Sequence, residues 1–286
     1  MTTAPGAADR AVWINGALVD PDEASVSVFD HGFTVGDGVF ETLKVVDGRP
    51  FAVTRHLARL ERSAVGLGLD VPIGPDKLRI AMDEVIAAVG PAAGRLRITL
   101  TGGPAPLGSD RGSAGPTLVV VAARATSWDP STTAITVPWP RNERSAVAGL
   151  KTTSYAENVV ALAEAAKLGA TEAIFPNLAG ALCEGTGSNV FVVVDGRLLT
   201  PSLLSGCLGG VTRALLLEEL PGADEEDMPI ERLADDDVTE VLLTSSTRDA
   251  QPLHAINGRA LPGADGPVAQ QAAAALAALQ ARTVDP

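Results

Sequence analysis

The chain has 286 residues, of which 46% are apolar and 20% are charged, which is enough for two domains with separate cores. Its net charge of −13 argues against nucleic acid as a partner, because that binding requires a basic surface. Two cysteines and three histidines show no metal-site spacing, so we expect no metal. No apolar run could cross a membrane and residues 1–10 do not resemble a signal peptide, so we expect a cytoplasmic protein.

The first part of the sequence predicts an N-terminal α/β domain over residues 1–125. Asn15-Gly16 is typical of a tight hairpin turn, and Thr54 is a candidate cap for the first long helix. Gly66 and Gly68 end that helix. The predicted elements are a strand hairpin at 12–19, a strand ending near 45, a helix from 54, a helix at 75–89, and strands at 95–100 and 117–122. The glycine- and proline-rich segment 102–112 either borders a binding site or is ordinary surface chain.

Three arginines, Arg55, Arg59 and Arg62, recur at helical spacing in the first long helix. A solvated basic face is the ordinary explanation of such a row, and a clamp for an anion is the alternative.

The second part predicts a linker at residues 126–136, which contains Pro130, and then a C-terminal domain over residues 137–286. The predicted elements are a helix at 159–168, strands at 172–175, 190–194, 197–200 and 240–244, a helix that ends near 220, and a helix from about 268.

Lys151 is the candidate reactive group of the sequence. It lies in a short loop with Thr152, Thr153 and Ser154, directly before a helix. A lysine amine becomes a nucleophile when desolvation or nearby positive charge lowers its pKa, and it then forms a Schiff base with a carbonyl compound or with pyridoxal phosphate (PLP). A solvated lysine at a helix start is the alternative.

Three further features suit a phosphorylated aromatic cofactor. The run Gly209-Gly210-Val211-Thr212 opens a helix, where free backbone N–H groups attract phosphate, although glycine before a helix is also common punctuation. The run Ser245-Ser246-Thr247 offers further donors or is an ordinary turn. Glu184 either holds a pyridine nitrogen protonated or is a solvated carboxylate.

Together these residues resemble the class IV (fold type IV) PLP enzymes, from Trp13 to the C-terminal helix. Glu184-Gly185-Thr186-Gly187-Ser188-Asn189 carries the strongest likeness. The resemblance implies a mixed α+β, two-domain fold, with a smaller N-terminal α/β sandwich and a larger C-terminal pseudo-barrel, and a homodimer. It implies that Lys151 forms the Schiff base. The implied cofactor contacts are Arg59, Tyr155, Glu184, Val211, Thr212 and Ser246, and the expected substrate contacts are Val35, Arg97 and Thr247.

The branch within the family is inferred by elimination. Branched-chain aminotransferases usually have a tyrosine at Val35 and a Glu-Gly pair at Glu41-Thr42. D-amino acid aminotransferases typically have an Arg-x-His in the loop where this chain has Leu107-Gly108-Ser109. Elimination favours a 4-amino-4-deoxychorismate lyase, which releases pyruvate and 4-aminobenzoate for folate synthesis, with Arg97 and Arg111 as candidate carboxylate partners. An aminotransferase for D-amino acids or branched-chain amino acids is the alternative, and a non-catalytic PLP carrier is a third possibility.

Overall fold

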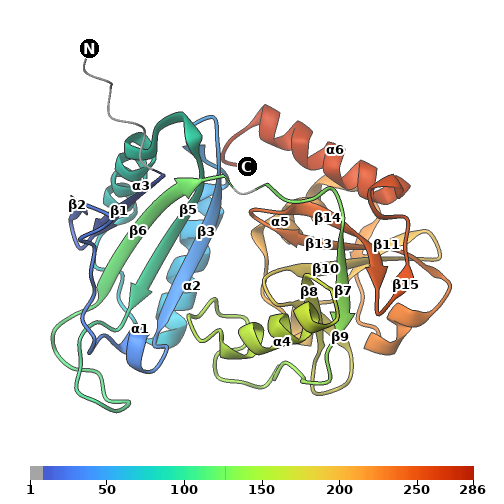
Figure 1. Ribbon diagram of the computed structural model, residues 1–286, viewed down its shortest axis with the longest axis horizontal. Helices are drawn as coiled ribbons and strands as arrows, with labels where there is room; N and C mark the ends of the chain where they lie inside the picture. The colour runs from blue at the N-terminus through green and yellow to red at the C-terminus, as the bar shows by residue number, and fades with distance from the viewer. Residues whose placement is uncertain (1–8, 126) are drawn as a thin grey trace. The chain divides into compact units, whose positions relative to one another are not determined.

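The structure is a computed structural model that describes residues 9–125 and 127–286. It divides into two compact units (Figure 1). Unit 1 contains Met1–Ser127, Leu150–Ser154 and Thr283–Pro286, and unit 2 contains Trp128–Gly149 and Tyr155–Arg282. Among the described residues, no helix is long and apolar enough to cross a bilayer.

Unit 1 is an antiparallel sheet of six strands in the order β2-β1-β6-β5-β3-β4. Its strands are β1 (Arg10–Ile14), β2 (Ala17–Val19), β3 (Gly38–Val46), β4 (Arg49–Pro50), β5 (Ala93–Thr101) and β6 (Thr117–Arg124). Its helices are α1 (His31–Thr34), α2 (Val53–Leu67) and α3 (Pro75–Val89).

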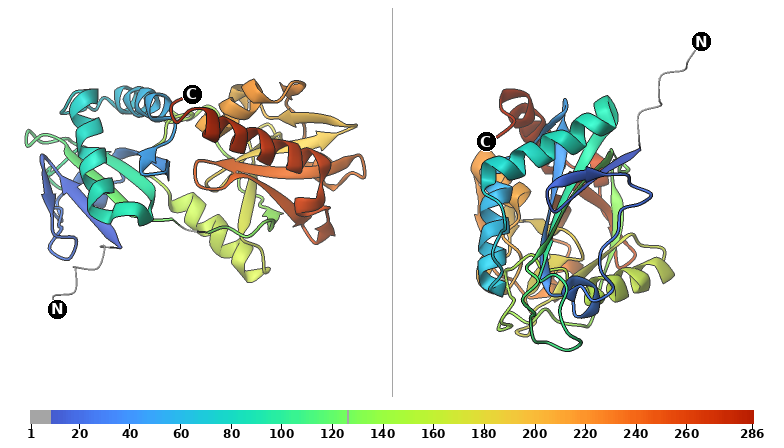
Figure 2. Two further views of the ribbon diagram at one scale, coloured as in Figure 1. Left: turned by 90° about the horizontal axis from the view of Figure 1, so that it is seen from above. Right: turned by 90° about the vertical axis from the view of Figure 1, so that its left-hand side faces the viewer.

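Helices α2 and α3 cover one face of this sheet (Figure 2). Alternate residues of β5, such as Leu96, Ile98 and Leu100, are fully buried in a core with Leu60 of α2 and Met82 of α3. The intervening residues of β5 are more exposed. This period of two is typical of a sheet with only one face packed on helices.

Residues 150–154 pair with the first residues of β3, on the side of this strand that does not face β5. The Phe40 N–H donates to the Lys151 carbonyl at 3.0 Å, and the Thr153 N–H donates to the Gly38 carbonyl at 2.8 Å. An isolated antiparallel bridge joins Val39 to Thr152 between these bonds. The backbone of the candidate lysine is therefore fixed by β3.

Unit 2 is a mixed sheet in the order β12-β11-β10-β13-β14-β7-β8-β9, with β15 paired to β14. Its strands are β7 (Thr132–Thr136), β8 (Glu172–Pro176), β9 (Leu182–Gly185), β10 (Asn189–Val194), β11 (Arg197–Thr200), β12 (Ala223–Glu225), β13 (Val238–Ser245), β14 (Asp249–Ile256) and β15 (Arg259–Ala260). Its helices are α4 (Ala156–Lys167), α5 (Val211–Glu219) and α6 (Pro267–Arg282). All six residues of β10 are buried, as expected for a strand covered on both faces.

The predicted helix at Pro75–Val89 and the predicted strand at Arg197–Thr200 are confirmed, and the other predicted helices and strands are found with shifted ends. The proposed cap at Thr54 is wrong, because α2 begins at Val53 and Ala52 occupies the N-cap position with a φ of 55°. Residue 126 of the predicted linker lies outside the described residues, and Thr132–Thr136 at its other end is strand β7, between β14 and β8.

Candidate functional site

The Lys151 amine lies over the ring of Phe40, 4.4 Å from the ring centroid. Its backbone N–H donates to the Ser63 hydroxyl of α2 at 3.1 Å. With its backbone bonded on one side to β3 and on the other to α2, Lys151 has a fixed origin for its side chain.

The guanidinium of Arg97 shares the Phe40 ring with Lys151, at 3.8 Å from the centroid. The distance between the Arg97 guanidinium and the Lys151 amine therefore cannot exceed the sum of their distances to the Phe40 centroid, 3.8 and 4.4 Å. Arg97 Nε also donates to the Thr99 hydroxyl at 3.2 Å, which orients the guanidinium along β5. An amine and a guanidinium within that separation can receive a carbonyl carbon and a carboxylate of one small molecule.

Val35, a predicted substrate contact, lies next to the same segment. It ends α1 and is 46% exposed. The carbonyl of its neighbour Gly36 accepts hydrogen bonds from the hydroxyls of Thr153 at 2.9 Å and Ser154 at 3.1 Å. Val35 and Lys151 thus belong to connected segments of unit 1.

Arg111 does not lie free to bind a substrate carboxylate. Its Nε and Nη2 donate to both oxygens of Asp37 at 2.7 and 2.5 Å, and Nη1 donates to the Gly68 carbonyl at 2.9 Å. The guanidinium therefore fastens the loop between β5 and β6 to the turn before β3. Of the two candidate carboxylate partners, Arg97 is the one that shares a ring contact with Lys151.

Arg59 is buried and does not belong to a solvated basic face. Its Nε and Nη2 donate to the two oxygens of Glu41 on β3, both at 2.7 Å, and His56 Nδ1 lies 2.7 Å from the same carboxylate. Burial alone would raise the pKa of Glu41, but Arg59 and His56 lower it to about 2. Burial lowers the pKa of His56, and the cations of Arg59 and Lys151 add to that effect. Arg59 is thus oriented by a carboxylate that is charged at neutral pH.

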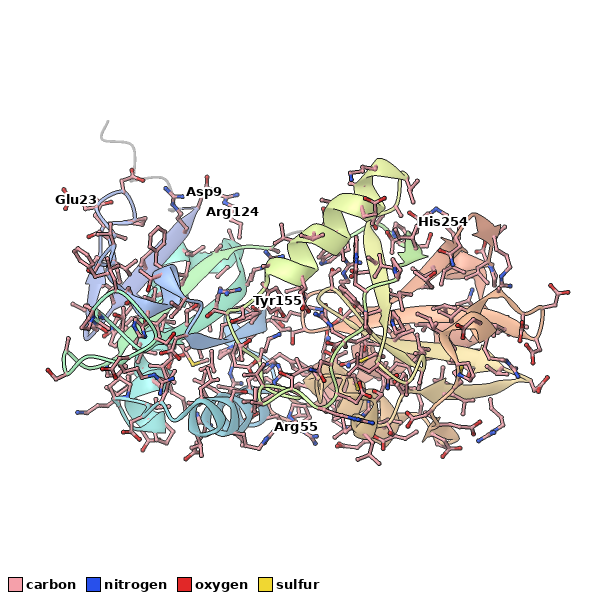
Figure 3. The ribbon with its side chains drawn as sticks, turned by 90° about the horizontal axis from the view of Figure 1, so that it is seen from below. Asp9, Glu23, Arg55, Arg124, Tyr155 and His254 are labelled. Atoms are coloured by element: carbon pink, nitrogen blue, oxygen red, sulfur yellow. The ribbon has the colours of Figure 1, made fainter. Side chains whose placement is uncertain are left out.

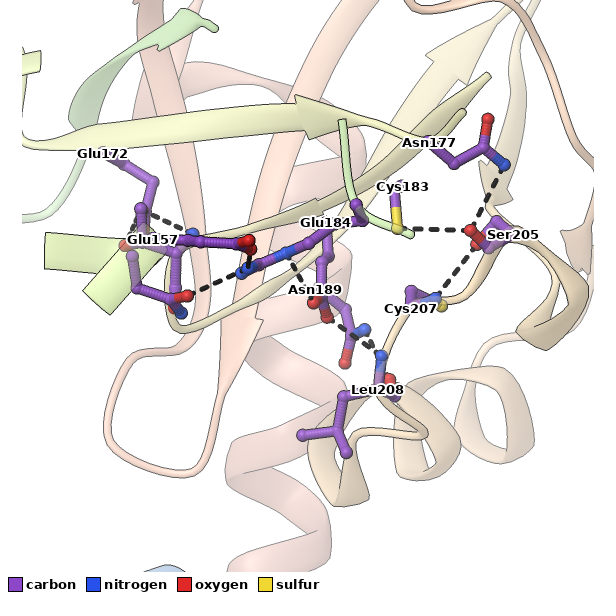
Figure 4. Close-up of polar contacts among 12 residues, drawn as sticks. Glu157, Glu172, Asn177, Cys183, Glu184, Asn189, Ser205, Cys207 and Leu208 are labelled. Carbon is purple, nitrogen blue, oxygen red and sulfur yellow. Dashed lines mark hydrogen bonds and ion pairs between the residues drawn. The ribbon is translucent and has the colours of Figure 1, made fainter. Parts of the chain in front are cut away.

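Glu184, on β9 in unit 2, is held at both oxygens (Figure 4). One accepts the Leu208 N–H at 2.9 Å, and the other lies 3.3 Å from Nε of Arg141. Arg141 stacks over the Phe175 ring at 4.0 Å and donates to the Asn158 side chain at 2.9 Å. A carboxylate held at both oxygens has a fixed orientation, as a partner for a protonated ring nitrogen requires.

The N-terminus of α5 follows directly from Leu208. Gly210 is the N-cap residue and has no side chain of its own to cap the helix. Its first turn therefore offers the backbone N–H groups of Val211 and Thr212 to a ligand, with the positive end of the helix dipole. Asn189 donates to the Leu208 carbonyl at 2.7 Å and fixes this loop. Glu184 is thus bonded to the segment that leads into the predicted phosphate-binding site at the start of α5.

The other predicted contacts lie at the ends of elements. Ser246 and Thr247 form the turn between β13 and β14. Tyr155, labelled in Figure 3, occupies the N-cap position of α4.

The two cysteines are adjacent in sequence to Glu184 and Leu208, and both are buried. Burial raises the pKa of Cys207 to about 11, and burial and the Glu184 charge raise that of Cys183. Both thiols therefore stay protonated at neutral pH and are poor nucleophiles.

Two residues that hold the candidate site were not predicted from the sequence, because Ser63 and Arg141 carry no distinctive pattern.

The family model of amino-transferase class IV matches residues 38–256. The chain belongs to the class IV aminotransferases. The D-alanine aminotransferase of Staphylococcus haemolyticus is 31% identical over 279 residues, covering 91% of this chain and 94% of the relative. The branched-chain aminotransferase of the archaeon Thermoproteus uzoniensis, solved with norvaline, is 29% identical, with a TM-score of 0.84 and 92% of each chain covered. A Legionella pneumophila protein described as a "Putative 4-amino-4-deoxychorismate lyase" is 25% identical, with a TM-score of 0.83 and 91% and 97% covered.

These findings confirm the mixed α+β, two-domain fold and a PLP-dependent enzyme of this family, since other solved neighbours hold PLP or a phosphopyridoxyl derivative. The residues of this chain fit that cofactor, because unit 2 carries a carboxylate paired with Arg141 and an α5 N-terminus whose N-cap residue is glycine. The specific prediction of a lyase is not established, since relatives named as aminotransferases are at least as similar.

Proposed function

We propose that the chain is a PLP-dependent aminotransferase that acts on D-amino acids or branched-chain amino acids. The observation that carries the proposal is the shared Phe40 ring, because it brings the Arg97 guanidinium and the Lys151 amine close together. An amino acid and a 2-oxo acid both carry a carboxylate, which Arg97 would bind while their reacting carbon faces Lys151.

In this proposal the Lys151 amine would bind PLP at the aldehyde group of the cofactor. Glu184 keeps the ring nitrogen protonated, and Tyr155 donates to the ring hydroxyl. The phosphate is bound by the N–H groups of Val211 and Thr212, with the side chains of Arg59 and Ser246. When bound, PLP supplies an electron sink for the carbon that loses its proton. The Lys151 amine would take that proton from the substrate carbon.

One of the two candidate carboxylate partners offered for the lyase loses weight, because Arg111 is engaged by Asp37. A lyase remains the second candidate because of the similarity to the Legionella pneumophila protein. In a lyase the same first proton transfer would be followed by loss of pyruvate.

The test supplies purified enzyme with D-alanine, L-leucine or L-valine, each with 2-oxoglutarate, and separately with 4-amino-4-deoxychorismate. Formation of 2-oxo acid and glutamate is expected. Release of 4-aminobenzoate and pyruvate without amino transfer would replace the proposal by the lyase. Borohydride should fix the cofactor on Lys151, as read by peptide mass, and Lys151→Ala should lose both this label and turnover. Turnover by Lys151→Ala would refute the role of Lys151.

A further inference from the structure

Glu172 is a fully buried carboxylate at the start of β8. Oε1 accepts the backbone N–H groups of Ala173 and Thr186, both at 3.0 Å, and the Thr186 hydroxyl. Oε2 accepts the Ser188 hydroxyl at 3.2 Å. One carboxylate therefore holds the turn 185–188, which directly follows Glu184.

The same carboxylate also binds a second turn. Arg248, whose side chain is 9% exposed, has Nη2 at 3.3 Å from Glu172 Oε2. Its guanidinium lies 4.0 Å over the Trp128 ring, and Nη1 donates to Gln251 at 2.8 Å. The Arg248 N–H closes the turn after β13 by donating to the Ser245 hydroxyl at 3.3 Å. Ser246 and Thr247 lie within this turn.

The sheet explains why one residue reaches both turns. Strands β10 and β13 are antiparallel neighbours, with Asn189 at the start of β10 opposite Thr244 near the end of β13. The turn before β10 and the turn after β13 therefore lie at the same edge of the sheet.

The space around Gly185 provides independent evidence that turn 185–188 packs tightly against Glu172. A Cβ at this position would collide with the Ser188 hydroxyl and would lie 3.3 Å from the Glu172 carboxyl carbon. The backbone beside Glu184 thus lies directly against Glu172, with no room for a side chain.

We propose that Glu172 is a positioning residue. It fixes turn 185–188, which follows Glu184, relative to the turn after β13, which contains Ser246, so that both turns can bind the cofactor. The proposal rests on the proposed cofactor roles of Glu184 and Ser246. Glu172 itself touches neither cofactor nor substrate. Its charge orients Thr186, Ser188 and Arg248, which belong to the two turns.

The experiment compares Glu172→Gln with Glu240→Gln. Glu240 is a matched control, because it is also a buried carboxylate of unit 2 and accepts backbone N–H groups, from Val268 at 3.0 Å and Ala269 at 2.8 Å at the start of α6. The apo-proteins are titrated with PLP and with unphosphorylated pyridoxal, and their Tm is measured.

Glu172→Gln should raise the Kd for PLP by about tenfold or more, since several hydrogen bonds to a charge are weakened. It should also move the pH midpoint of the visible absorption band of bound PLP, because Glu184 no longer meets the ring nitrogen correctly. Glu240→Gln should lower Tm, with the Kd for PLP and the midpoint unchanged. Equal Kd values and midpoints for wild type and Glu172→Gln would overturn the proposal.

Thr186→Val and Ser188→Ala cover the case in which Glu172→Gln does not fold. Each removes one hydroxyl from the network and should raise the Kd for PLP while Tm changes little. An unchanged Kd in both would also overturn the proposal. The proposed function fails separately, if Glu184→Gln in an otherwise wild-type chain leaves PLP binding and the absorption midpoint unchanged.

Discussion

Glu41 and Arg59 form a pair in unit 1 whose side chains are 0% and 6% exposed. Such a pair contributes little net free energy compared with apolar residues, but removal of one partner leaves a buried charge uncompensated. The sequence favoured a solvated face for Arg59, because spacing along one helix cannot reveal a carboxylate from a distant strand. Burial of Glu41 among α2 side chains supplies the missing contact.

Replacement of Glu41 should therefore destabilise the protein strongly. We expect Glu41→Gln to lower the free energy of unfolding by about 3–5 kcal/mol at pH 7, measured by urea denaturation. Asp9→Asn is the control, because the Asp9–Arg124 pair is solvent-exposed at the surface of unit 1 (Figure 3). A loss for Glu41→Gln no larger than that of the control would contradict this assignment.

The same pair predicts a pH dependence. The pKa of Glu41 falls from 4.5 to about 2 on folding, so its contribution to stability is complete above about pH 4.5 and is lost as the pH falls toward 2. The unfolding free energy of the wild type should decline over this window more steeply than that of Glu41→Gln. Parallel curves for the two proteins would show that Glu41 does not ionise as proposed.

The contact between Arg141 and Glu184 leads to a prediction about PLP binding. Arg141→Met should raise the Kd for PLP about tenfold, because Glu184 loses the guanidinium that lies against one of its oxygens. Arg144→Met, three residues away and exposed, should leave the Kd within about twofold of the wild type. The measurement is an absorbance titration of apo-protein, and equal Kd values for the two variants would contradict the role of Arg141.

At the scale of elements, helices and alternating strands were predictable, since their periodicity reports burial on one face. Strand β14 was missed because Pro252 and Gln251 interrupt an apolar pattern, yet both are buried beside β13. Strand β7 resembled a linker because it is rich in threonine beside Pro130. Threonine is β-branched, and neighbouring strands decided the outcome. The chemistry-bearing residues Lys151 and Glu184 were singled out by type and context, whereas their supporting residues depend on tertiary contacts.

The start of α5 gives a prediction with a neighbouring control. A Cβ at residue 210 would collide with Asn189 Oδ1, whereas a Cβ at residue 209 would meet nothing closer than 3.7 Å. Gly210→Ala should therefore displace the first turn of α5 and raise the Kd for PLP more than the Kd for pyridoxal. Gly209→Ala should change both far less. A similar effect of the two variants in these titrations would argue against a phosphate seat at this helix end.

At the scale of the whole molecule, the last residues of the chain satisfy backbone groups at the start of helix α2. Helix α2 has no cap of its own, and Asp285 accepts the N–H and hydroxyl of Thr54 at 2.9 and 2.6 Å. The Ala52 N–H donates to the Val284 carbonyl at 2.7 Å. A distant acidic side chain thus satisfies the N-terminus of the helix that carries Arg59.

A chain ending at Arg282 should consequently have a weakened α2. We expect a loss of about 1–2 kcal/mol in unfolding free energy and faster hydrogen exchange of the first-turn amides of α2. Asp285→Ala should reproduce most of the effect, and Asp22→Ala, at an exposed ion pair, should not. Unchanged exchange at residues 53–56 in the shortened chain would contradict the capping role.

The segment Leu150–Ser154 belongs to unit 1, although the residues on both sides of it belong to unit 2. In a hybrid of two related genes, Lys151 can therefore come from one parent and the unit 1 residues that contact it from the other. A recombinant joining the first 127 residues of one relative to the remainder of another would seat the donor's lysine against a foreign aromatic ring and a foreign serine hydroxyl. Crossover points for shuffled enzymes of this kind should keep that pentapeptide with the parent that supplies β3 and α2.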